Sequence, residues 1–163
     1  MSTPSRRRFL QSSAALAATV STRPILGAQG NKNSKLRILQ IGAGGIGQLD
    51  RKELANHPMV EFTGFCDVDG KWLANYSEPY PDAFKVADYR EAFAQHADKF
   101  DAVVIDTPDL HHAPMLITAL QNHKHVYGQK PLVQQLDEMR LVREALKKRP
   151  ACVTQMGNQR ATN

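Results

Sequence analysis

The chain has 163 residues, of which 42% are hydrophobic and 23% are charged. This length allows one domain with a proper core, and the composition is that of a globular protein. The net charge of +5 comes mostly from four arginines in the first 28 residues, a stretch that contains no acidic residue. Without them, 17 basic residues face 16 acidic ones, a net charge of +1. This balance argues against a nucleic-acid-binding protein.

The N-terminus resembles an export signal. Arg6, Arg7 and Arg8 precede Phe-Leu and then an uncharged, alanine-rich stretch. This order is typical of a twin-arginine signal, and the stretch is too short for a stable membrane anchor, which needs about 20 strongly apolar residues. We therefore expect residues 1–28 to be a twin-arginine signal peptide and 29–34 a linker, with the mature protein periplasmic or exported. An amphipathic or disordered N-terminus is the alternative.

After the linker, short apolar runs alternate with segments of helical periodicity. The apolar runs predict strands at 36–42, 60–67, 84–86, 101–107, 125–127 and 151–157. The periodic segments predict helices at 46–57, 88–97, 111–123 and 132–148, with a short helical piece at 71–76. Alternating strands and helices indicate parallel βαβ units. Six such strands predict an α/β fold with a doubly wound parallel sheet, a Rossmann domain over residues 35–157.

The stretch LQIGAGGIGQLD, residues 39–50, places four glycines between the first strand and the first helix. In a phosphate-binding loop, the first glycine allows a tight turn, the second lets the backbone approach the pyrophosphate, and the third lets the helix pack against the sheet. The free N–H groups at the helix start then bind the phosphates. The motif alone also suits an ordinary turn. Its setting predicts that the cofactor is bound by Gly42, Gly44, Gly45, Ile46 and Gly47.

An acidic residue at the end of the second strand supports this interpretation. Asp67 lies 20 residues beyond Gly47. A carboxylate at this place accepts hydrogen bonds from the ribose hydroxyls of the adenosine and disfavours a 2′-phosphate by its charge. The sequence therefore predicts NAD as cofactor. NADP stays possible because Lys71 is close by.

Two later motifs resemble a known family. TPDLHHA, residues 107–113, follows the fourth strand, and YGQKPLV, residues 127–133, follows the fifth. With the glycine loop and Asp67 before them, these motifs resemble the Gfo/Idh/MocA oxidoreductases, which include glucose–fructose oxidoreductase and inositol dehydrogenase. The resemblance covers roughly residues 35–160.

The resemblance implies roles for individual residues. Thr107 and Pro108 are expected to line the cofactor near its phosphates and nicotinamide ribose. His112 is expected near the nicotinamide, as a catalytic residue. Lys130 is expected to contact both cofactor and substrate and to help move the substrate's proton. Gln129 is expected to contact the cofactor.

The chain departs from the family pattern at two positions. Gln129 stands where the family usually has Glu. The glutamine keeps hydrogen-bonding capacity but lacks the charge that would pair with Lys130. Leu110 stands where the family has its first histidine. No metal site is predicted, because the adjacent His111 and His112 cannot face one ion from the same side of a helix.

Members of the family carry a second, substrate-binding domain. We expect residues 158–163 to be the truncated start of that domain, so that a small sugar or polyol substrate would be held by residues missing from this chain. The full-length protein could form oligomers. The predicted function is the NAD(P)-binding domain of an exported oxidoreductase that transfers hydride to or from such a substrate, and the chain is not expected to be active alone. The alternatives are an NAD-dependent glycosidase of the same family and a truncated, non-catalytic nucleotide-binding module.

Overall fold

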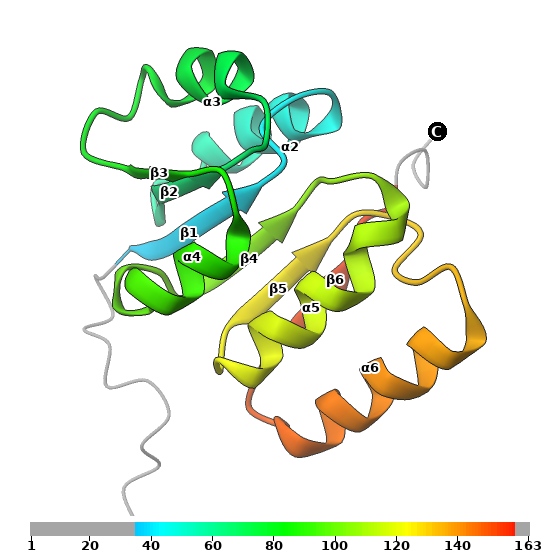
Figure 1. The fold of residues 1–163 in the computed structure, drawn as a ribbon. Coiled ribbons are helices and arrows are strands. Elements are labelled where there is room, and N and C mark those ends of the chain that lie inside the picture. Colours follow the sequence, from blue (N-terminus) through cyan, green and yellow to red (C-terminus); the bar gives the residue numbers. More distant parts are fainter. Residues whose placement is uncertain (1–34, 159–163) are drawn as a thin grey trace, which may run out of the picture. The chain divides into compact units, whose positions relative to one another are not determined.

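The computed structural model describes residues 35–158, so the predicted signal peptide, the linker and residues 159–163 lie outside the described part. Within that part, six parallel strands form one sheet in the order β3-β2-β1-β4-β5-β6 (Figure 1). The strands are β1 Leu36–Ile41, β2 Val60–Cys66, β3 Phe84–Val86, β4 Ala102–Ile105, β5 His125–Gly128 and β6 Thr154–Met156. This order is the doubly wound arrangement of a Rossmann domain, as predicted.

Helices cover both faces of the sheet (Figure 1). They are α2 Ile46–Ala55, α3 Gly70–Ser77, α4 Tyr89–Gln95, α5 His112–Gln121 and α6 Leu136–Lys148, with 3-10 turns η1 Ala97–Lys99 and η2 Asp109–His111. Helices α2 and α3 contribute side chains to the core on one face, and α4 and α5 contribute to the core on the other. Helix α6 packs on α5.

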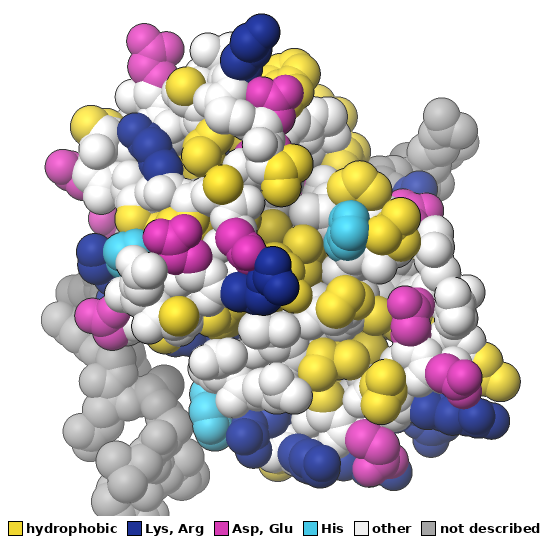
Figure 2. Space-filling model, in the orientation of Figure 1, with side chains coloured by type: hydrophobic (Ala, Val, Ile, Leu, Met, Phe, Trp, Pro, Cys, Tyr) yellow, Lys and Arg dark blue, Asp and Glu magenta, His cyan; other side chains and the backbone are white. Residues whose placement is uncertain are grey.

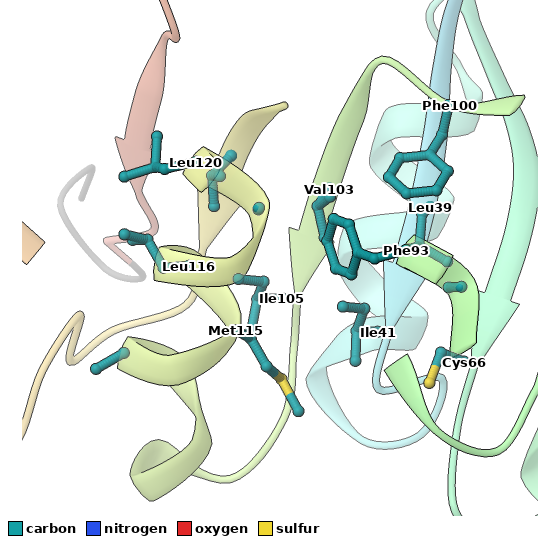
Figure 3. Close-up of a cluster of buried hydrophobic side chains, with 14 of the residues drawn as sticks. Leu39, Ile41, Cys66, Phe93, Phe100, Val103, Ile105, Met115, Leu116 and Leu120 are labelled. Carbon is teal, nitrogen blue, oxygen red and sulfur yellow. The ribbon is translucent and has the colours of Figure 1, made fainter. Parts of the chain in front are cut away.

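The strands are apolar because their side chains are buried on both faces, as is usual for parallel sheets. Alternate residues of β1 and β4 point to the side of α4 and α5, where Figure 3 shows them among the aromatic and aliphatic side chains of those helices. On this side, β1 contributes Leu39 and Ile41, and β4 contributes Val103 and Ile105. Those on the opposite side, toward α2 and α3, include Ile38, Phe62, Phe65 and Val104.

Helix α6 begins later than predicted, at Leu136 instead of residue 132. The carboxylate of Glu138 explains the start, because it accepts hydrogen bonds from the backbone N–H groups of Gln134 and Gln135 at 2.8 and 3.1 Å. The Gln135 side chain in turn contacts the backbone at Glu138, so the two residues form a capping box. A capping box marks the N-terminal end of a helix. The predicted ends of several other elements were also one to three residues too long.

The apolar residues of α6 are less buried than its periodicity suggests. Leu136, Met139 and Leu141 are 64%, 46% and 61% exposed, although their pattern predicts inward positions. Val142 is the fully buried residue of the helix. Helix α6 packs against α5, and its apolar residues that join the core are Val142, Ala145 and Leu146.

The described surface carries mixed charge. On the face shown in Figure 2, acidic and basic side chains are interspersed between apolar ones. Among the described residues, no helix is both long and apolar enough to span a bilayer.

Candidate functional site

The glycine loop turns sharply between β1 and α2. Gly42 has φ 91°, in the left-handed region, and a Cβ there would lie 2.7 Å from the backbone carbonyl atoms of Asp106. A Cβ on Gly47 would overlap the carbonyl oxygen of Gly42 and lie 2.9 Å from Nε2 of Gln40. A side chain is therefore excluded at both positions, the first by the turn and the second by close packing of helix on strand.

A cavity of about 580 Å³ opens beside this loop. It lies where the strand order reverses between β1 and β4, at the carboxyl ends of the strands, which is the usual ligand position in open α/β sheets. Seven of the predicted cofactor-binding residues line it, namely Gly42, Gly44, Gly45, Ile46, Asp67, Thr107 and Pro108. Gly47 lies beneath the loop in close contact with Gly42 and Gln40.

Asp67 connects the end of β2 to the glycine loop. Its Oδ2 accepts a hydrogen bond from the backbone N of Ala43 at 2.7 Å, and its Oδ1 accepts one from the backbone N of Asp69 at 2.9 Å. A carboxylate has about four acceptor positions, so Asp67 can still accept from two ligand hydroxyls. Its charge and place therefore suit a ribose diol.

An ion pair that sequence reasoning missed also lines the cavity. Arg90 Nη2 lies 2.6 Å from Oδ2 of Asp88, and both residues are lining residues. Asp88 also caps α4 by accepting from the backbone N of Arg90. The hydrogen-bonded guanidinium lowers the pKa of the Asp88 carboxyl. The short D-x-R spacing at a helix start was the available signal.

The structure places His112 away from the open cavity. The side chain is 1% exposed, and His111 is the histidine that lines the cavity instead. Nδ1 of His112 lies 2.7 Å from the carbonyl oxygen of Pro131, and Nε2 lies 2.7 Å from that of Thr107. In place of the expected contact with the reacting groups, His112 joins the two loops that follow β4 and β5.

Lys130 is exposed on the loop after β5 and is not among the residues lining the cavity. Gln129, the residue before it, is 3% exposed. The Gln129 amide nitrogen donates to Oδ2 of Asp50 at 2.5 Å. The two predicted residues thus differ in setting, since the lysine is open to solvent and the glutamine is part of a buried polar group.

That buried polar group lies under the glycine loop. Gln40 Nε2 donates to the carbonyl oxygen of Gly47 at 2.7 Å and to Oδ2 of Asp106 at 2.8 Å. Arg51 donates to Oε1 of Gln40 at 3.2 Å. We call the side chains of Gln40, Asp50, Arg51, Asp106 and Gln129 the sub-loop cluster. It links β1, α2 and the loops after β4 and β5.

Within the sub-loop cluster, Asp106 holds its proton unusually tightly. Burial raises the pKa of its carboxyl to about 8, the hydrogen bond from Gln40 opposes that rise, and the nearby carboxyl of Asp50 adds to it. Oδ1 of Asp106 is buried and finds no N–H or O–H donor among residues 35–158. The Asp106 carboxyl therefore favours its protonated form more than an exposed aspartate does.

The sub-loop cluster was missed apart from Gln129, although the sequence carried a signal for it. Gln40 lies in the apolar run LRILQIG and Asp106 in the run DAVVIDT. A polar side chain in a strand buried on both faces requires a buried partner. Gln40 and Asp106 were the polar residues in these two apolar runs, and each was therefore a candidate partner for the other.

The strand order, the glycine loop and the cavity at the reversal point together define a dinucleotide-binding Rossmann domain. The chain belongs to the Gfo/Idh/MocA family, described as an oxidoreductase family with an NAD-binding Rossmann fold, whose profile matches residues 36–156. The family thus binds NAD, as predicted.

Several characterised or solved proteins are similar to the chain. A glycosyl hydrolase family 109 protein of Stenotrophomonas maltophilia is 35% identical over 125 residues, 71% of this chain and 27% of the relative. An inositol 2-dehydrogenase of Rubrobacter xylanophilus is 28% identical over 119 residues, 69% of this chain and 32% of the relative. The structure of scyllo-inositol dehydrogenase from Lactobacillus casei with NAD(H) and scyllo-inositol superposes with TM-score 0.70 at 22% identity, covering 76% of this chain and 36% of that one. The chain therefore spans about a third of the length of these relatives.

Proposed function

We propose that this chain is the NAD(P)-binding domain of an exported oxidoreductase that moves hydride between the nicotinamide and a sugar or polyol. The observation that carries the proposal is the cavity at the sheet's reversal point, walled by the glycine loop and bordered by Asp67. The family membership and the similarity to an inositol 2-dehydrogenase support it.

The residues present fit a dinucleotide. Gly42 leaves no room for a side chain, and Gly44 and Gly45 present bare backbone to the cavity before α2 begins at Ile46. The N–H groups at that helix start suit a pyrophosphate. Asp67 suits the adenosine ribose and repels a 2′-phosphate, which favours NAD over NADP. The nicotinamide, when bound, supplies the hydride acceptor or donor.

Lys130 is the proposed proton partner of the substrate. Its Nζ can hydrogen-bond to a substrate hydroxyl and receive the proton that leaves with oxidation, or return it on reduction. His112 acts at a distance, because its ring bonds the carbonyl of Pro131, the residue after Lys130. We therefore propose a positioning role for His112. The remaining substrate contacts are proposed to come from a second domain, as the greater length of the relatives suggests.

The test uses the full-length protein that contains this domain, with inositols and simple sugars as substrates and reduced cofactor as the readout. Lys130→Ala should lower turnover by at least about a hundredfold, within the range of general acid–base catalysis, and leave NAD affinity nearly unchanged. Lys147→Ala is the matched control, because this lysine is exposed on α6 and pairs with Glu144. Normal turnover in Lys130→Ala would remove the lysine from the mechanism.

A second candidate function is NAD-dependent glycoside hydrolysis, which the 35% identical family 109 relative favours. In this reaction class the cofactor is oxidised and reduced within one cycle. Release of sugar from an aryl glycoside without accumulation of reduced cofactor would identify it. Accumulation of reduced cofactor with a free polyol would identify the dehydrogenase. Binding of NAD without either reaction would identify a non-catalytic module.

Export is a separate part of the proposal, supported by the arginine motif before the apolar stretch in residues 1–28. Replacing Arg6, Arg7 and Arg8 by lysine keeps the charge but removes the twin-arginine motif. The variant should accumulate in the cytoplasm, as fractionation of the cells would show. Unchanged export would contradict the assignment.

A further inference from the structure

A side-chain hydrogen bond joins helix α2 to the loop that carries Lys130. Nε2 of Gln129 donates to Oδ2 of Asp50 at 2.5 Å, across 79 residues of sequence. Oε1 of Gln129 accepts from the backbone N of Lys130 at 3.3 Å. The two contacts use opposite ends of the amide, so together they define its orientation. Gln129 is buried, with 3% of its surface exposed, whereas Asp50 is half-buried.

Asp50 already has an acidic neighbour on its other side. Burial and the nearby carboxyl of Asp50 raise the pKa of Asp106, while Gln40 Nε2 donates to Oδ2 of the Asp106 carboxyl and opposes that rise. A carboxylate at position 129 would offer Asp50 no hydrogen and would add a like charge at hydrogen-bond distance. An amide offers the N–H that Asp50 needs.

We propose that Gln129 is a positioning residue matched to Asp50, and that this pair holds the backbone of Lys130 against the helix that follows the glycine loop. The part that concerns Lys130 rests on the proposed function. The glutamine in the Q-K-P motif, where the family pattern has glutamate, is in this chain the residue that fits its neighbours.

The proposal predicts that the amide and the carboxylate can be exchanged between positions 129 and 50. Gln129→Glu places a carboxylate against Asp50 and should lower the thermal midpoint of the 163-residue chain by about 5–10 °C. Asp50→Asn alone should change it by less than about 2 °C, because the asparagine oxygen still accepts from Gln129. In the double variant, the asparagine amide can donate to the new carboxylate and its oxygen can accept the proton of Asp106. The midpoint should then return to within about 2 °C of the wild type.

Gln121→Glu is the matched control, since Gln121 is exposed at the end of α5. It should leave the midpoint unchanged, with or without Asp50→Asn. A stable Gln129→Glu variant, or a double variant no better than Gln129→Glu, would overturn the pairing. Because the thermal measurements need no cofactor, they decide the pair independently of the proposed function.

Binding of NAD tests the positioning role. Trp72 is the single tryptophan of the chain and lies against Gly44, where a Cβ would be 3.4 Å from its ring, so its fluorescence reports on the loop. At a temperature where all variants are folded, Gln129→Glu should bind NAD about tenfold more weakly and the double variant should recover. Unchanged NAD affinity in Gln129→Glu would overturn the positioning role and leave only a stabilising one. Failure of the wild type to bind NAD would instead contradict the proposed function.

Discussion

Replacing Asp106 by asparagine should stabilise the protein at high pH but not at low pH. Asparagine imitates the protonated acid, because its oxygen can accept from Gln40 and its amide can donate to Asp50. The pKa of Asp106 is raised to about 8 in the folded protein, against about 3.9 for an unperturbed aspartate. Between these values the folded state keeps a proton that the unfolded state has lost. Stability of the wild type is therefore fully present below about pH 4 and falls as pH rises toward about 8.

The size of this effect follows from the shift. Each pKa unit corresponds to about 1.4 kcal/mol, so a shift of about four units sets a ceiling of about 6 kcal/mol. Local relaxation and the high effective dielectric constant of real protein interiors reduce this, and we expect Asp106→Asn to gain about 2 kcal/mol at pH about 8 relative to its effect at pH about 5. Urea unfolding at both pH values measures the difference. Asp137→Asn, at an 83% exposed side chain on α6, is the control and should show no such rise. Equal effects of Asp106→Asn at both pH values would refute the raised pKa of Asp106.

Three further substitutions test the packing around the site. Gly47→Ala should cost about 2–3 kcal/mol of unfolding free energy because its Cβ meets the Gly42 carbonyl, and a neutral effect in urea unfolding would contradict that contact. His112→Phe removes the hydrogen bonds to two backbone carbonyl groups and should cost at least about 2 kcal/mol in the same assay. A wild-type midpoint would show that His112 does not stabilise the contact between the loops after β4 and β5. On α6, Val142→Ala should cost about 1 kcal/mol while Leu141→Gln stays within about 0.5 kcal/mol, and the reverse order would contradict the burial of Val142 and the exposure of Leu141.

Much of the fold was predictable because its signals are local. The apolar runs located all six strands, including the three-residue β3, and the alternation with helices indicated a parallel sheet. Helix α6 was less well predicted, since periodicity shows which residues share a side but not how much of that side a neighbour covers. Leu141 and Val142 are adjacent in sequence, yet 61% and 3% exposed.

Some residues of the site could be predicted from local sequence signals and others could not. The sequence located Gly42, Gly47 and Asp67. The two glycines are required by the backbone of the loop, and Asp67 lies at a fixed spacing from it. Within the sub-loop cluster, Gln40 and Asp106 had a signal as polar residues in apolar runs, whereas the pairing of Asp50 with Gln129 had none, because these residues meet only after the chain has folded across 79 residues. His112 matched a motif, but only the structure shows that both its ring nitrogens are bound to backbone carbonyls.

The most direct test of the central claim is a calorimetric titration of the 163-residue chain with NAD and with NADP. The wild type should bind one NAD, and should bind NADP more weakly. Asp67→Ala should weaken NAD by about tenfold to a hundredfold, as expected for the loss of hydrogen bonds to a charged group, and should change NADP less. Asp82→Ala, at an exposed position, is the control and should bind like the wild type. Folded wild-type protein that binds neither dinucleotide would contradict the assignment of the glycine loop as a cofactor site.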